Sequence, residues 1–323
     1  MTNKIQIKIF LFSAFIFNQA YSVDLQPPTT LKTAPSGKPI NAPGQNKEFL
    51  CIPGVPEDIT IQQTNNFWLD GLNLIISEYS TVAVEGDVYN GPSFFYTTLT
   101  ETERHFHGNG IPNHKTGIYP VQEGTKAYAY YSTAPAQGYS SAAEIPIEPY
   151  NLDVIVPRNP IYSETPYCIN QLVVGIATQT GSRWDASIAY SDRWVDPIAA
   201  LPLDECWGHP YNKQYHYHGY SWKCFPNLGS TRQHSPLLGY ALDGFGIYGP
   251  RGDGGKLLTN NDLDACHGHM GIIDWDGNLQ YMYHYHVNAE FPYGPGCFRG
   301  LPALITSFQA LVHVHGEPIP PHT

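Results

Sequence analysis

The chain has 323 residues, a formal net charge of −11 and only 14% charged residues. An acidic chain without a basic stripe cannot neutralise a phosphate backbone, so nucleic acid is not an expected partner. The 30 glycines and 28 prolines favour many turns and short strands over helices. We therefore predict an all-β protein.

Residues 1–22 are predicted to form a secretory signal peptide. Lys4 and Lys8 provide a basic start, residues 9–17 form a short apolar run, and residues 20–22 form a small-x-small cleavage site. The apolar run is too short to span a bilayer, and no later segment approaches the roughly 20 apolar residues that a spanning helix requires. We expect a secreted or periplasmic protein with no membrane span.

The remaining chain is predicted to contain one folded unit. Residues 23–47 are rich in Pro, Thr, Gly and Asn and should form a disordered linker, residues 48–317 a β domain, and residues 318–323 a loose tail. Runs of β-branched and aromatic residues between turn signals predict strands at residues 59–61, 72–76, 82–84, 126–131, 152–157, 172–178 and 304–314.

One segment of the chain occurs twice. Residues 203–225 and 263–298 share Leu, Asp, Cys, Gly and His at one spacing, and each contains the quartet Tyr-His-Tyr-His, at residues 215–218 and 283–286. Side chains alternate across a strand. The two histidines of a quartet should therefore project from one face of a strand and its two tyrosines from the other.

The second copy also predicts a hairpin. Asp276, Gly277 and Asn278 separate two strand-like runs, residues 272–275 and 279–282, and this composition is typical of a tight turn. The returning strand would carry the second quartet. We expect a mainly antiparallel, sandwich-like fold with pseudo-twofold character around the two quartets.

All six cysteines lie beyond the predicted signal peptide, and six cysteines allow 15 pairings. The duplication favours one bridge within each copy, which leaves one pair outside the copies. The expected disulfides are Cys206 with Cys224, Cys266 with Cys297, and Cys51 with Cys168. The alternative, in which the cysteines are metal thiolates, is disfavoured by an even count in an oxidising compartment.

Several motifs occur in the order found in the YHYH-domain proteins, which this chain resembles from about residue 60 to residue 300. They are the two quartets, each preceded by Cys-x-Gly-His, and residues 109–114, 234–245 and 291–300. The chain departs from the family pattern at Gly246, where Pro is usual, and at residues 177–181, which replace an Asn-Gly turn. The resemblance implies an exported β-rich domain and leaves the chemistry to the residues.

The histidines predict a metal centre or a symmetric pair of centres, because clustered imidazoles in an exported protein are typical of metal sites. Three ligands with an open position suit zinc, and several histidines beside tyrosine suit copper. A bound metal would allow hydrolysis by an activated water or electron transfer, although no residue is assigned a catalytic role. The expected ligands are His209, His216 and His218 in one set and His269, His284 and His286 in the other, with His234 and Asp243 as extra or orienting groups.

Other interpretations remain open. The His and Tyr residues could form a hydrogen-bonded sheet face that binds no ion, or a non-catalytic surface that recognises a glycan, a small molecule or a protein partner. A metal store would also recruit the histidine pairs at residues 105 and 107 and at residues 313 and 315. Metal binding requires the quartet histidines to converge within about 4 Å of a common point.

Overall fold

A computed structural model describes residues 47–51, 58–60, 68–70, 73–75, 83–133, 145–187, 197, 201–221, 223–225, 230 and 232–305. Their strands form an eight-stranded sheet, a three-stranded sheet and two two-stranded sheets. The all-β prediction is confirmed. The predicted signal peptide, the loose tail and the pair His313 and His315 lie outside the described residues, and the domain boundaries stay predictions.

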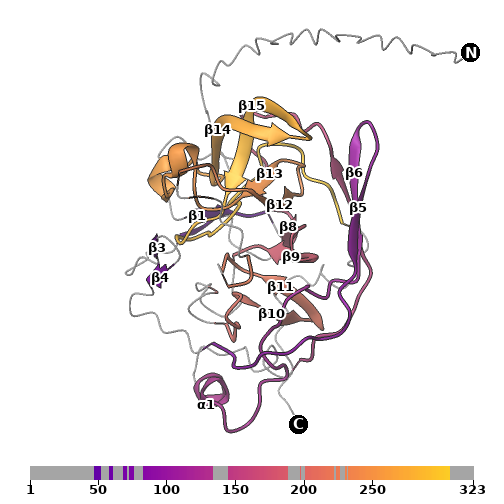
Figure 1. Ribbon diagram of the computed structural model, residues 1–323, viewed down its shortest axis with the longest axis vertical. Helices are drawn as coiled ribbons and strands as arrows, with labels where there is room; N and C mark the ends of the chain where they lie inside the picture. Colours follow the sequence, from indigo (N-terminus) through magenta and orange to yellow (C-terminus); the bar gives the residue numbers. More distant parts are fainter. Residues whose placement is uncertain are drawn as a thin grey trace, which may run out of the picture.

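The large sheet runs in the order β10-β11-β9-β8-β12-β13-β15-β14, from β14 at the top of Figure 1 to β10 at the bottom. Its strands are β8 (Val173–Ala177), β9 (Ser182–Asp185), β10 (Gly208–Tyr211), β11 (Gln214–Tyr217), β12 (Leu237–Ala241), β13 (Gly246–Tyr248), β14 (Gly268–Trp275) and β15 (Asn278–His286).

The two halves of this sheet have matching connections. In each half, one hairpin (β8-β9 or β12-β13) joins a second hairpin (β10-β11 or β14-β15) through a parallel pair, β9 with β11 or β13 with β15. The halves meet where β8 and β12 pair antiparallel, with Ile176 opposite Tyr240. The structural repeat is therefore longer than the sequence repeat, because it begins at β8 and at β12.

Short turns fix the register of both quartet hairpins. Two residues connect β10 to β11, and Asn212 and Lys213 have φ values of 48° and 67°. Asp276 and Gly277 connect β14 to β15 with φ values of 53° and 84°. Two consecutive positive φ values are typical of the hairpin turns that match strand twist. The hairpin predicted around Asp276 is confirmed.

The three-stranded sheet packs on the large one, which gives the fold its sandwich-like character (Figure 1). It consists of β5 (Phe95–Leu99), β6 (Glu103–Gly108) and β7 (Leu152–Pro157). The Phe106 ring stacks on that of Tyr240 with centroids 5.6 Å apart, and the Arg104 guanidinium lies over the Tyr240 and Trp275 rings. Alternation along β6 buries these side chains against the large sheet.

The remaining elements are short. They are β1 (Lys47–Phe49) paired with β2 (Asp58–Thr60), β3 (Trp68–Asp70) paired with β4 (Asn73–Ile75), α1 (Lys126–Thr133), and the 3-10 turns η1 (Asp253–Gly255) and η2 (Asn260–Asp262). The predicted strands at residues 59–61, 72–76, 152–157 and 172–178 overlap β2, β4, β7 and β8. Residues 83 and 84, expected in a strand, and residues 304 and 305 have no regular structure.

The strand predicted at residues 126–131 is wrong, because this segment forms α1. The Thr125 hydroxyl accepts a hydrogen bond from the Tyr128 amide at 3.1 Å, and the Thr125 carbonyl accepts one from the Ala129 amide at 3.1 Å. These contacts start a helix with a threonine cap. The alternation of Ala and Tyr that suggested a strand leaves Tyr128 and Tyr130 exposed.

Three disulfides join the pairs expected from the duplication, Cys51–Cys168, Cys206–Cys224 and Cys266–Cys297. The second and third each lie within one copy of the sequence repeat and tie the start of a quartet hairpin to the segment that follows it. Such a set of bridges fits an extracellular protein.

Candidate metal centre

The histidines of the repeats gather into two clusters. The three-His cluster consists of His209, His216 and His218, and the four-His cluster of His234, His269, His284 and His286. Within each cluster the candidate donor nitrogens lie within 4.8 Å of one another. The two predicted sets of three are thus each brought together, and His234 joins the second.

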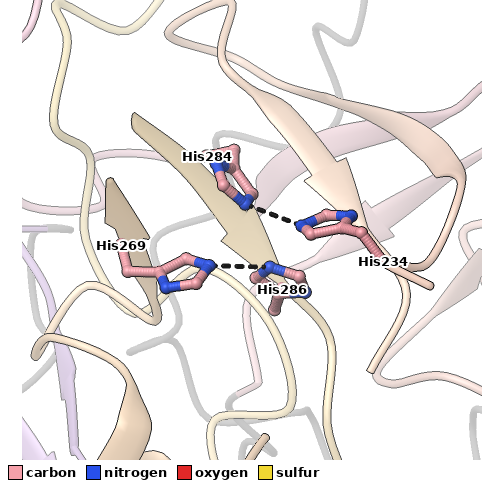
Figure 2. Close-up of side chains that lie close together, drawn as sticks. All are labelled: His234, His269, His284 and His286. Carbon is pink, nitrogen blue, oxygen red and sulfur yellow. Dashed lines mark hydrogen bonds between the residues drawn. The ribbon is translucent and has the colours of Figure 1, made fainter. Parts of the chain in front are cut away.

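Strand pairing places these side chains. His209 on β10 lies opposite His216 on β11, and His269 on β14 lies opposite His284 on β15. The second quartet histidine follows two residues later and therefore projects from the same face. His234 approaches from the segment before β12, and Figure 2 shows its ring directed towards those of the β14-β15 hairpin.

Backbone carbonyls determine which nitrogen of each ring carries the proton. The Nδ1 atoms of His216 and His218 lie 3.1 Å from the carbonyl oxygens of Gln214 and Ala186, respectively. A carbonyl oxygen only accepts, so each Nδ1 must donate. The Nε2 lone pairs of both neutral rings consequently point into the three-His cluster.

The four-His cluster follows the same rule. The Nδ1 atoms of His234, His284 and His286 donate to the carbonyl oxygens of Ser235 at 2.8 Å, Met282 at 3.2 Å and Gly249 at 2.6 Å. Ala186 and Gly249 occupy equivalent places after β9 and β13. The two repeats therefore orient their quartet histidines with the same backbone contacts.

In each cluster, two Nε2 atoms that carry no proton face each other. Nε2 of His216 lies 3.1 Å from Nε2 of His218, and Nε2 of His234 lies 3.0 Å from Nε2 of His284. Each of these rings already donates from Nδ1, so two lone pairs meet at hydrogen-bond distance. A cation between them would convert this repulsion into attraction.

The remaining short contacts can be hydrogen bonds. Nε2 of His209 lies 3.2 Å from that of His218, and Nε2 of His269 lies 3.1 Å from that of His286 (Figure 2). His209 and His269 can donate from Nε2, since neither ring has a Nδ1 contact to a carbonyl among the described residues. Nδ1 of His209 is buried without a partner in this part of the chain.

Burial keeps the cluster histidines neutral. Desolvation, followed by the neighbouring imidazoles, lowers the pKa of His209, His284 and His286 well below 6.5. Desolvation also lowers the pKa of His216 well below 6.5 and that of His218 to about 4. Neutral imidazoles at pH 7 are the form that binds a metal ion.

The distances suit four-coordinate metal binding. Two nitrogens that bind one tetrahedral ion, each at about 2.0 to 2.1 Å, lie about 3.3 Å apart. The short contacts between Nε2 atoms in the two clusters range from 3.0 to 3.2 Å. Small ring movements would therefore admit an ion.

The tyrosines of the quartets lie on the opposite face and are buried. Tyr215 donates to Asp204, with oxygen distances of 2.9 and 3.0 Å, and Tyr283 donates to Asp264 at 2.8 Å. Each of these carboxylates also accepts two backbone amides of its own loop, those of Cys206 and Gly208 or of Cys266 and Gly268, and Asp204 accepts that of Gly117 as well. The tyrosines thus connect each quartet strand to the loop that begins its copy.

Asp243, expected as an extra ligand or an orienting group, is also on the tyrosine face. It accepts the Tyr285 hydroxyl at 2.6 Å and the amides of Phe245, Arg299 and Gly300. Strand alternation places Tyr285 and His286 on opposite faces of β15. The carboxylate therefore points away from the cluster donors.

The other conspicuous histidines make separate contacts. His105 and His107 lie on the outer face of β6, where the His107 ring stacks on Tyr96. His267 donates to the His286 carbonyl from Nδ1, and its Nε2 lies 2.8 Å from Oδ1 of Asn260. His114 lies beside the Cys206–Cys224 disulfide, whose sulfurs are not available as thiolates, and its Nε2 accepts the Tyr217 hydroxyl.

Sequence reasoning missed a buried carboxylate beside the three-His cluster. Oδ2 of Asp185, at the end of β9, lies 3.7 Å from Nε2 of His216. Asp185 lies outside the recognised sequence repeat, and only the parallel pairing of β9 with β11 brings it to the quartet. A lone Trp-Asp pair in the sequence carries no signal for this role.

A comparison with protein families matches residues 143–256 to the model described as YHYH protein. The expected resemblance is confirmed over this range, which contains the first quartet and His234 and ends before the second quartet. Neither the curated proteins nor the solved structures gave a match. In the part of the chain that the structure describes, no helix is long and apolar enough to cross a membrane.

Proposed function

We propose that this chain is an exported metal-binding protein that holds one transition-metal ion in each histidine cluster. The observation that carries the proposal is the contact between Nε2 lone pairs, His216 with His218 and His234 with His284, at 3.1 and 3.0 Å. Both rings of each pair donate from Nδ1 to carbonyls, so no neutral tautomer makes a hydrogen bond between the two Nε2 atoms. Burial opposes a shared proton, because it disfavours the charged imidazolium.

A purely structural histidine network explains less. Such a network would pair each ring nitrogen with a donor or an acceptor, since buried polar groups are normally satisfied. Here the carbonyl contacts leave two acceptors facing each other in both repeats. A facing pair of acceptors occurs in both clusters, although non-equivalent residues form it, and this supports a requirement for a cation at each.

The quartets give little support to recognition of a glycan or a partner through a Tyr and His face. Tyr215, Tyr217 and Tyr285 are fully buried and Tyr283 is 2% exposed. Stacking on a sugar requires an accessible ring. The quartet histidines are buried as well, so a large ligand would need another surface.

Copper and zinc are the ions that best suit these donors, since imidazole is a good ligand for both. The ion would supply either a bound water of lowered pKa, for hydrolysis, or a redox centre. Such turnover is the less supported part of the proposal, because the described residues form no substrate-sized cavity at either cluster. Export to the periplasm or the medium is supported by the three disulfides and by the apolar run at residues 9–17.

The proposal is tested by elemental analysis of mature protein purified without chelators and then reconstituted with zinc or copper. We expect about two ions per chain in the wild type, one in His216→Ala and one in His284→Ala, and none in the double variant, because each substitution removes a central donor of one cluster. His105→Ala, outside both clusters, is the matched control and should retain two ions. A wild type that binds no metal after reconstitution would refute the proposal.

A further inference from the structure

We infer that Asp185 is the fourth ligand of the three-His cluster, so that this cluster is a closed site that retains its ion, whereas the four-His cluster is open to solvent and exchanges its ion. The inference rests on the proposed function and assigns a different role to each of the two sites. It concerns a carboxylate that lies outside the histidine pattern.

Asp185 lies beside the three-His cluster but outside the set of donors that are all within 4.8 Å of one another, so its side chain would have to move slightly to bind the same ion. Its Oδ2 lies 3.7 Å from Nε2 of His216, close to the distance of about 3.3 Å that separates two donors on one tetrahedral ion. The residue is 5% exposed, so its carboxylate faces the protein interior. Together with His209, His216 and His218 it would supply three nitrogens and one oxygen.

Arg183 holds this carboxylate in place. Its Nε donates to Oδ1 of Asp185 at 2.7 Å and its Nη2 donates to Oδ2 at 3.1 Å, and both side chains are buried. A carboxylate oxygen has a second lone pair, so Oδ2 can still bind an ion. Carboxylates that bind metals are usually hydrogen-bonded in turn, and Arg183 would have this role.

The second repeat lacks an equivalent carboxylate. Trp184 pairs with Tyr217 on β11, and Ile247 pairs with Tyr285 on β15. Trp184 and Ile247 are therefore equivalent in the two repeats, and the next residues along the two strands, Asp185 and Tyr248, are equivalent as well. The Tyr248 ring lies 5.1 Å from the rings of His234 and His284, and the fourth donor of that cluster is His234 itself.

The two clusters also differ in exposure. His209, His216 and His218 are 3%, 2% and 6% exposed, and of the three only His218 lines a cavity of water size that Asp185 and Ser187 also line. His234 and His269, by contrast, are both partly exposed. The four-His cluster therefore has two ligands that reach the surface, whereas the three-His cluster has none.

The first test is the rate of zinc release to a chromogenic chelator from protein loaded with two zinc ions. We expect one ion to leave the wild type at least about tenfold faster than the other, since ligand and outer-shell contacts commonly change metal retention by 10-fold to 100-fold. His234→Gln should lose the fast phase. Asp185→Asn should accelerate the slow phase and leave the fast phase unchanged, and Asp153→Asn, an exposed carboxylate on β7, is the matched control.

The second test leaves the buried Arg183–Asp185 pair intact. A crystal structure of zinc-loaded wild type should show anomalous density in the three-His cluster, with an Asp185 oxygen about 2.0 to 2.2 Å from the ion. An ion held by the three histidines and a water, with Asp185 beyond 3 Å, would overturn this inference alone, as would equal release rates at both sites. The absence of zinc from both clusters would refute the proposed function as well.

Discussion

Each quartet histidine is oriented by a carbonyl of the backbone rather than by another side chain. The Nδ1 proton of His218 goes to Ala186, and that of His286 goes to Gly249. Because the backbone is held by the sheet, the direction of each Nε2 lone pair is set before any ion arrives. This preorganisation is typical of metal sites, in which a second contact fixes the ring.

Gly271 provides the space for a histidine of the four-His cluster. A Cβ added there would lie 2.9 Å from Cε1 of His284 and 3.9 Å from Nε2 of His269. Gly271→Ala should displace the His284 ring and weaken zinc binding at this cluster on the order of tenfold. Titration calorimetry should show one weakened and one unchanged site. Gly294→Ala, whose nearest atom would be Val287 Cγ1 at 3.9 Å, is the control, and equal affinities in both variants would contradict the expectation.

The buried carboxyl group of Glu48 should make the stability of the protein depend on pH. Its Oε1 accepts the Ser187 amide, its Oε2 is buried without a partner among the described residues, and burial raises the pKa of the carboxyl to about 8. The folded state thus holds a proton between pH 4.5 and 8 that the unfolded state releases. The stability that this group contributes is complete below pH 4.5 and is lost by about 1.4 kcal/mol per pH unit as the pH rises to 8.

The variant Glu48→Gln isolates this effect, since the amide has a similar size and no charge at any pH. Its free energy of unfolding relative to the wild type should rise between pH 5 and pH 8, measured by urea denaturation in one metal state. Other titrating groups contribute equally to both proteins. A difference that stays constant over this range would show that Glu48 is ionised in the folded protein.

At the scale of an element, β15 has two faces with different roles. The His face carries the donors of the four-His cluster, whereas the Tyr face connects the strand to Asp264 and Asp243. The same division holds for β11. The period-2 alternation of the quartet is therefore the local pattern that permits a metal site on one side of a sheet and a structural hydrogen-bond network on the other.

Tyr283→Phe separates these two roles. It removes the hydroxyl that donates to Asp264 at 2.8 Å, although Arg299 and two amides still contact that carboxylate. We expect the free energy of unfolding to fall by about 1.5 to 3 kcal/mol, the usual net contribution of a hydrogen bond to a charged group. The count of two zinc ions per chain should not change. His284→Gln should lose one zinc ion and leave the hydrogen bond between Tyr283 and Asp264 intact. Loss of an ion in Tyr283→Phe would contradict the division of faces.

The helix α1 shows where local pattern fails at this scale. Alternating Ala and Tyr residues favour a strand, but both residue types also occur in helices, and Thr125 caps the first turn. Of the side chains described in this run only Ala127 is buried, and one small buried residue does not fix the period of the segment. Short segments of this kind are decided by their end contacts.

At the scale of the whole molecule, the pseudo-twofold relation sets the position of the sites. Ile176 and Tyr240, which are equivalent in the two repeats, face each other where β8 pairs with β12. The neighbouring Gly175 and Gly239 allow the two strands to approach. A Cβ added at Gly175 would lie 2.8 Å from the backbone carbonyl oxygen of Tyr240, and one added at Gly239 would lie 2.0 Å from that of Ile176. The two clusters consequently lie in opposite halves of one sheet and cannot merge into a single centre.

Two ions in one sheet should stabilise the fold as a whole. An ion that binds only the native state contributes about 4 kcal/mol when its free concentration is 1,000 times its Kd. Removal of both ions by a chelator should therefore lower Tm by roughly 15 °C in a domain of this size, and added zinc should restore it. Differential scanning calorimetry checks this, with the double variant His216→Ala, His284→Ala as the control that zinc should not affect.

The β class, the quartet faces, the three disulfide pairs and the grouping of the histidines could all be predicted from the amino-acid sequence, because alternation, turn chemistry and duplication are local or repeated patterns. The positions of Asp185, Asp243 and His234 relative to the quartets follow from the folded structure alone. Each comes from a segment outside the quartet hairpins, and its place depends on which strands pair: β9 brings Asp185 to the His face, whereas the turn after β12 brings Asp243 to the Tyr face. Strand order and parallel pairing leave no local signal in a single chain, so the difference between the two sites became visible only in the folded sheet.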